Sequence, residues 1–79
     1  MTKAYCLIEI GEHERVREIR QKLEKMKGKG RIVSTEVITG PHDLIVVLRG
    51  PNVFAISDAV LSGIRKIDGI TRTITMIVV

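Results

Sequence analysis

Five consecutive residues near the middle of the chain, Thr39, Gly40, Pro41, His42 and Asp43, have the types that a small charged ligand needs. Glycine lets the backbone approach a ligand closely, and backbone N–H groups in such a turn can bind an anion. The carboxylate of Asp43 can accept an ammonium group. The turn therefore offers partners for both ends of an amino acid. The competing interpretation, which residue types alone favour, is a β-turn in which Asp43 caps its own backbone.

Thr73 and Thr75 form a second polar pair, inside an otherwise apolar segment at the C-terminal end. Because they are two residues apart, their hydroxyl groups project from the same face of a strand. The high β-propensity of threonine explains their presence equally well.

Catalytic or metal-binding chemistry has little support elsewhere in the chain. The two histidines, His13 and His42, have no histidine or cysteine close to them in sequence, and His13 is expected to be solvated. Cys6 is the single cysteine, which excludes an internal disulfide and suits a reducing compartment. Its apolar neighbours indicate a core residue. We expect no catalytic residue, no metal and no cofactor.

Apolar periodicity predicts six elements in the order βαββαβ. The first helix is expected to end at Gly28 and Gly30, and Asp68 with Gly69 is expected to stop the second. This order predicts one domain over residues 1–79, an α+β ferredoxin-like sandwich whose four-stranded antiparallel sheet carries two helices on one face. The predicted strands cover residues 3–10, 31–39, 43–49 and 70–79, and the helices 12–27 and 52–67.

The second face of the sheet is also apolar in this sequence. Along the third strand Leu44, Val46 and Leu48 alternate with Ile45 and Val47, so neither side is polar. An exposed apolar face of that kind is an association site. We therefore expect the sheets of two copies to pair as a dimeric α+β barrel, with an unstable monomer. The interface residues expected are Ile45, Val47, Ile77 and Val79.

The net charge of +4 is concentrated in one segment, residues 15–31, which holds eight basic and two acidic residues. A basic helix raises the possibility of nucleic-acid binding, but Tyr5 and Phe54 are too few for base stacking. A solvated helix face is favoured. No apolar segment is long enough to span a membrane, so a cytoplasmic protein is expected. The many Lys, Arg, Glu, Ile and Val residues also suit a thermophile.

Two segments together resemble the C-terminal domain of the leucine-responsive regulator/AsnC family, also called the RAM domain. The family has a Gly-x-x-Asp turn between the second and third strands, matched by Gly40 and Asp43. It also has a final strand of the pattern G-[VI]-x-x-T-x-T-x-x-[VL], matched from Gly69 with Thr73 and Thr75. The resemblance covers residues 3–79.

The resemblance implies a non-enzymatic module that binds an amino-acid effector and acts in transcription regulation or amino-acid metabolism. Such domains dimerise through their sheets, often close into octameric rings, and bind the effector between dimers. Residues 39–43 would hold the amino and carboxylate groups, and Thr73 and Thr75 would complete the pocket. The chain looks like a stand-alone RAM protein without the helix-turn-helix domain. Sequence-specific DNA binding is therefore not expected, whereas co-assembly with full-length relatives is.

Two further interpretations remain open from the residues. An ACT-like regulatory domain shares the strand order and the class of ligand, and its ligand glycine would lie near Gly11. A small dimeric α+β-barrel enzyme would need polar residues between the two sheets, where this sequence has mostly Ile, Val and Thr.

Overall fold

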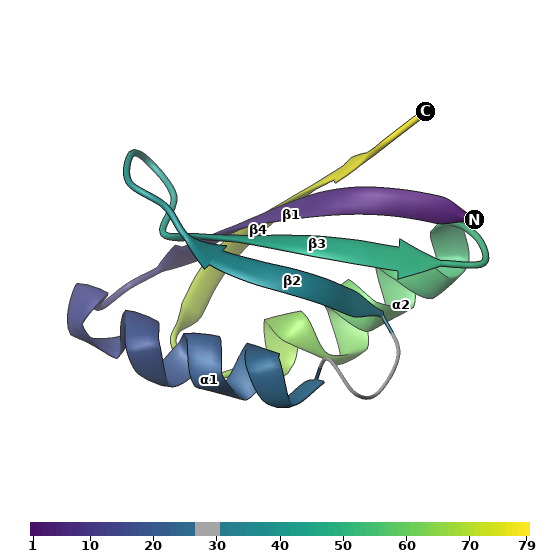
Figure 1. The fold of residues 1–79 in the computed structure, drawn as a ribbon. Coiled ribbons are helices and arrows are strands. Elements are labelled where there is room, and N and C mark those ends of the chain that lie inside the picture. The colour runs from purple at the N-terminus through teal and green to yellow at the C-terminus, as the bar shows by residue number, and fades with distance from the viewer. Residues whose placement is uncertain (27–30) are drawn as a thin grey trace.

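The computed structural model describes residues 1–26 and 31–79. Its elements follow the predicted βαββαβ order (Figure 1). The strands are β1 (Thr2–Ile10), β2 (Ile32–Val37), β3 (Leu44–Gly50) and β4 (Ile70–Ile77). The helices are α1 (Val16–Met26) and α2 (Val53–Ser62), with short 3-10 helices η1 (His13–Arg15) and η3 (Ile64–Lys66).

All four strands form one antiparallel sheet in the order β2-β3-β1-β4. Both helices lie on the same side of this sheet, and the other side carries no element of the described chain (Figure 1). The predicted α+β sandwich is therefore confirmed. Within the described residues, no helix is long and apolar enough to cross a membrane.

Helix α1 begins later than predicted, because residues 13–15 form the 3-10 turn η1 instead of an α-helical turn. Ile19 and Leu23 are fully buried, as expected for one apolar stripe four residues apart. On the outer face, the hydrogen bond from Arg15 lowers the pKa of Glu18. The predicted end of this helix at Lys27, Gly28 and Gly30 lies outside the described residues.

Helix α2 is shorter than predicted. Its start is capped by Asn52, whose side-chain oxygen accepts a hydrogen bond of 2.9 Å from the backbone N–H of Ala55. Ser62 ends the α-helix, and after Gly63 the chain continues as the 3-10 turn η3. Ile64 nevertheless remains fully buried. The spacing of apolar residues therefore continues past the end of the α-helix and does not indicate where the helix ends.

The core lies between the sheet and the two helices. Alternate residues of β1 and β3 face the helices and are buried, including Cys6, Ile8 and Val46. The intervening residues form what we call the open face. In register across β3, β1 and β4 it contains Ile45, Val47, Tyr5, Leu7, Ile74 and Met76.

One sequence-based assignment to this open face is wrong. Ile77 pairs with the buried Ala4 and packs against the core on the helix side. Val79 lies beyond the end of β4 and is fully exposed. The β4 residues on the open face are instead Ile74 and Met76, whereas Ile45 and Val47 lie there as expected.

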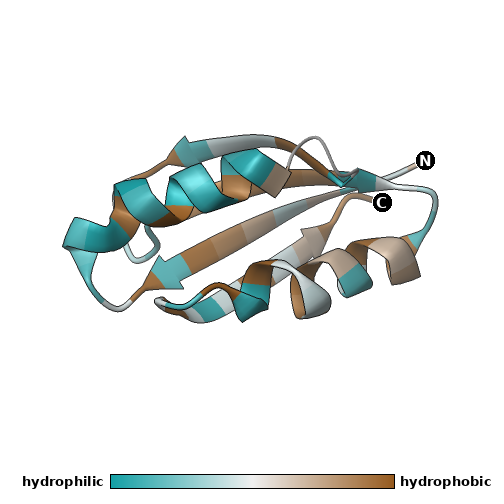
Figure 2. Ribbon diagram, turned by 90° about the horizontal axis from the view of Figure 1, so that it is seen from below, coloured by the Kyte–Doolittle hydropathy of each residue, from teal (hydrophilic) through white to brown (hydrophobic). Residues whose placement is uncertain are grey.

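The two helices lie apart on the sheet, and an apolar strand is visible between them from below (Figure 2). Helix α1 packs chiefly on β2, and α2 on β3 and β1. On this side of the molecule a groove lies between the end of α1, the start of β2 and α2.

Candidate ligand-binding site

The loop between β2 and β3 contains the five residues singled out from the sequence. It is closed at its base by a backbone hydrogen bond of 3.0 Å from Ile38 N to Asp43 O. Gly40 has φ +124°, a conformation that only glycine adopts without strain. Thr39, Gly40 and Pro41 are exposed, and His42 is half-buried. The loop rises from the sheet on the side opposite the helices (Figure 1).

Asp43 is the residue that fastens this loop to the sheet. Its backbone N–H donates to Ile8 O at 2.9 Å, and its carboxylate Oδ2 accepts from Ile10 N at 2.8 Å. Its side chain is only 10% exposed. Part of the carboxylate is thus used structurally, as the competing interpretation required, but the bonded backbone belongs to β1 instead of the turn itself. The Asp43 amide is not available to a ligand.

The second carboxylate oxygen faces a residue that the sequence reasoning set aside. His13 Nδ1 lies 3.1 Å from Asp43 Oδ1, while the His13 side chain is 83% exposed. The expectation that His13 is solvated is correct for most of its surface, but misses this contact. An exposed imidazole is therefore the contact that Oδ1 makes on its outer side.

A groove of about 500 Å³ begins at His13 and runs between α1 and the end of β2. Arg17 and Arg20 line it together with Glu14 and the apolar Val16 and Val37. Arg20 is held by Thr35, whose carbonyl oxygen accepts from its guanidinium at 3.2 Å. Arg17 is exposed and forms no ion pair with any residue in the described part of the chain. The groove thus has an excess of positive charge near the loop, and the guanidinium of Arg17 is not engaged in an ion pair within the described residues.

Thr73 and Thr75 share a face of β4, as predicted, and that face is the helix side. They lie opposite Ile8 and Cys6 in the register of β1. Leu44, next to Asp43, pairs with Ile8 from the opposite side of β1. Thr73 is therefore two strand spacings, about 10 Å in total, from the start of β3. Within one chain, the structure does not bring the threonines into contact with the loop.

Cys6 is buried beneath this edge. Burial raises the pKa of its thiol, and the hydrogen bond from Thr75 Oγ1 at 3.7 Å lowers it by less. Among residues 1–26 and 31–79, no three metal-ligating side chains gather in one place. These observations provide neither a nucleophile nor a metal centre beside the loop.

Comparison with known families decides what this arrangement belongs to. The family model described as the Lrp/AsnC ligand binding domain matches residues 3–79. The chain belongs to this family. The Lrp/AsnC match covers the loop, both threonines and, apart from Thr2, all four strands, so it confirms the sequence resemblance over its whole extent. The finding also decides against the ACT-like interpretation. Gly11, the glycine on which that interpretation depended, donates its N–H to Gly69 O at 3.2 Å.

Solved structures show the same Lrp/AsnC fold. The protein TTHA0845 from Thermus thermophilus is 26% identical with a TM-score of 0.88, and the match covers 100% of this chain and 94% of that one. The hypothetical protein PHS023 from Pyrococcus horikoshii is 28% identical with a TM-score of 0.86, covering 100% and 90%.

A transcriptional regulator, NMB0573 from Neisseria meningitidis, was solved as a complex with L-Met. It is 19% identical with a TM-score of 0.78, and the match covers 99% of this chain and 49% of the regulator. The chain thus spans about half the length of that protein. A comparison with curated proteins finds no match. The matching family model is described as a ligand binding domain, and the Neisseria neighbour is a transcriptional regulator.

Proposed function

We propose that this Lrp/AsnC domain binds an α-amino acid beside the loop of residues 39–43 and acts as a non-enzymatic regulatory module. The observation that carries the proposal is that the buried carboxylate of Asp43 contacts His13, and His13 lines a groove that also contains the Arg17 guanidinium, which forms no ion pair among the described residues. The Neisseria regulator, which has the same fold, was solved with L-Met. That precedent supports an amino acid as the class of ligand.

Each end of an amino acid has a partner at this site. Its ammonium group replaces the exposed His13 imidazole at Asp43 Oδ1, and its carboxylate pairs with Arg17. The side chain lies against Val16 and Val37 in the groove. A hydrogen bond to a charged group contributes about 1.5–3 kcal/mol, so the loss of either partner should weaken binding about tenfold or more.

Calorimetric titration with the protein amino acids tests this proposal. We expect at least one of them to bind, and Asp43→Asn and Arg17→Gln each to weaken it about tenfold or more. Arg65→Gln is the matched control, since Arg65 is an exposed arginine on η3, away from the groove. If no amino acid binds, or if the two site variants bind as tightly as Arg65→Gln, the proposal fails.

We also propose that the open face is covered by a second copy of the chain. Its central residues, Leu7, Ile45 and Val47, are only half-buried by their own chain, and Ile74 and Met76 are 37% and 45% exposed. A contiguous apolar surface of this kind drives association in water. The Lrp/AsnC family match supports an oligomeric assembly, and larger rings and co-assembly with full-length relatives belong to the same proposal.

Light scattering with Val47→Glu tests the association. A carboxylate at the centre of the open face has no partner in a covered interface, so the variant should sediment and scatter as an 8.8 kDa monomer. Leu61→Glu is the control, because Leu61 is 56% exposed on α2, away from the open face. A wild-type chain that remains monomeric at millimolar concentration contradicts the proposal.

A further inference from the structure

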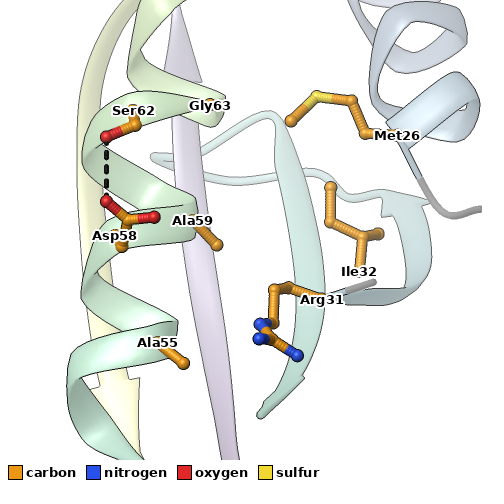
Figure 3. Close-up of a pocket in the computed structure, with 8 residues that line it drawn as sticks. All are labelled: Met26, Arg31, Ile32, Ala55, Asp58, Ala59, Ser62 and Gly63. Carbon is orange, nitrogen blue, oxygen red and sulfur yellow. Dashed lines mark hydrogen bonds between the residues drawn. The ribbon is translucent and has the colours of Figure 1, made fainter. Parts of the chain in front are cut away.

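The helix side of the molecule has a second cavity, separate from the loop site. A half-open groove of about 430 Å³ lies between the end of α1, the start of β2 and one face of α2 (Figure 3). It exists because α2 presents small residues here: Ala55, Ala59 and Gly63 are four residues apart and all line it. The side chains that would fill the space between the two helices are therefore missing.

Met26 and Gly63 form one end of this groove. A Cβ atom at Gly63 would lie 2.7 Å from Ala59 O and 2.8 Å from Met26 Cε, so a larger residue would clash with the backbone of α2 and displace the methionine methyl group. Ile32, which is 6% exposed, adds a second apolar side chain. Methionine is flexible and adapts its shape to apolar ligands. This end is suited to an aliphatic chain.

Arg31 lines the opposite wall, facing α2 across the groove (Figure 3). Its backbone is anchored by a hydrogen bond of 2.8 Å from Arg49 N to Arg31 O. Its Cδ and Nε pack over Gly50, lying 3.4 and 3.6 Å from the position of a Cβ there. The guanidinium forms no ion pair with any residue that the structure describes. A positioned, uncompensated guanidinium is a ready partner for a carboxylate.

Asp58 on α2 carries the opposite charge. Its Oδ1 accepts a hydrogen bond of 3.1 Å from Ser62 Oγ, and both residues line the groove. The carboxylate of Asp58 makes this wall unfavourable for a second negative charge. The groove therefore has a guanidinium that can bind an anion on one wall, a carboxylate that repels anions on the other, and apolar groups at its end.

We propose that this groove is a second ligand site, which binds a small monocarboxylate with a short aliphatic chain. The carboxylate pairs with Arg31, and the chain lies between Ala59 and Met26. Asp58 discriminates against dicarboxylates. The site does not depend on the loop of residues 39–43. It is lined by different residues and lies at the opposite end of α1.

Methyl NMR of the full chain labelled at the methionine methyl groups tests this site directly. The chain has three methionines. Met26 lies in the groove, whereas Met1 and Met76 lie at the terminus and on the open face and act as internal controls. We expect 4-methylpentanoate to shift the Met26 signal and to leave the other two unchanged. The same shift with 3-methylglutarate, a dicarboxylate, should require a much higher concentration.

Four variants complete the experiment. Arg31→Gln should weaken 4-methylpentanoate binding about tenfold or more, Arg65→Gln should leave it unchanged, and Ala59→Leu should block it by filling the groove. Asp58→Asn should reduce the difference between the mono- and the dicarboxylate. No shift of Met26 up to tens of millimolar 4-methylpentanoate, or an equal shift in Arg31→Gln, overturns the proposal.

A parallel titration with L-leucine distinguishes this groove from the loop site. A Met26 shift that persists in Asp43→Asn means that the groove also accepts an amino acid as its carboxylate, which supports the proposal. A Met26 shift by either compound that disappears in Asp43→Asn assigns the binding to the loop and overturns it. The proposed function can fail in its own titration without affecting this result.

Discussion

Replacing Asp43 by alanine should destabilise the fold even when no ligand is present. The carboxylate accepts a hydrogen bond of 2.8 Å from Ile10 N, and Ile10 is 3% exposed. Alanine leaves this backbone N–H buried without an acceptor, which costs about 1–3 kcal/mol. The contact with His13 adds little, because the His13 side chain is 83% exposed. We expect a loss of about 2 kcal/mol in the free energy of unfolding.

Urea unfolding followed by far-UV circular dichroism measures this change. For a domain of this size, about 2 kcal/mol also lowers the melting temperature by roughly 8–16 °C. All proteins must be compared at one concentration, because association adds to the measured stability. Asp43→Asn keeps an acceptor oxygen for Ile10 N and should lose less than about 1 kcal/mol. That is why the asparagine variant is the one suited to ligand titration.

Asp58→Ala provides the control for this prediction. Asp58 is an exposed aspartate whose hydrogen bond comes from the exposed Ser62, and its loss should change the stability by less than about 0.5 kcal/mol. If Asp43→Ala unfolds at the same urea concentration as Asp58→Ala, the reasoning from the buried hydrogen bond is refuted.

Two other predictions concern the backbone and the buried thiol. Gly40→Ala meets no atom within 4 Å but adopts φ +124°, so we expect a loss of about 1 kcal/mol in urea unfolding. Gly69→Ala combines φ +103° with a contact of 2.8 Å to Ile19 Cδ1 in the core, so its loss should be larger, about 2–4 kcal/mol; equal losses would contradict this difference. Because burial raises the pKa of Cys6, the folded chain retains the thiol proton that the unfolded chain loses. Stability should therefore fall as the pH rises past the ordinary thiol range, about 8.5, and Cys6→Ser should remove this decline. Rapid labelling of the native chain by iodoacetamide would argue against a buried Cys6.

Much of the fold could be predicted because it depends on local periodicity. The spacing of Ile19 and Leu23 specified the buried face of α1, and strict alternation along β1 and β3 specified two faces of the sheet. Alternation does not say which of the two rows faces the helices. In β4 both rows contain apolar residues, so the assignment of Ile77 to the open face had no local signal against it. The pairing with Ala4 settles the side that Ile77 occupies.

The candidate site was predictable only in part, for a different physical reason. The motif identified Asp43, but its partners come from positions far away along the chain: Ile10 is 33 residues before it, and His13 lies on another element. In the sequence, Arg17 cannot be told apart from the other basic residues of its helix. The structure shows that Arg20 donates a hydrogen bond to Thr35, whereas Arg17 forms no ion pair among the described residues. Spacing carries no information about contacts of this kind, because tertiary packing alone creates them.

The direction in which the β2–β3 loop leaves the sheet has a mechanical consequence. The loop rises on the side away from the helices, at one end of the sheet (Figure 1). In the dimer that we propose, this loop would limit the rotations and offsets at which a second copy can pack on the open face. Because Asp43 ties the base of this loop to β1, a ligand that alters this tie should also alter the alignment of the two copies in the dimer that we propose.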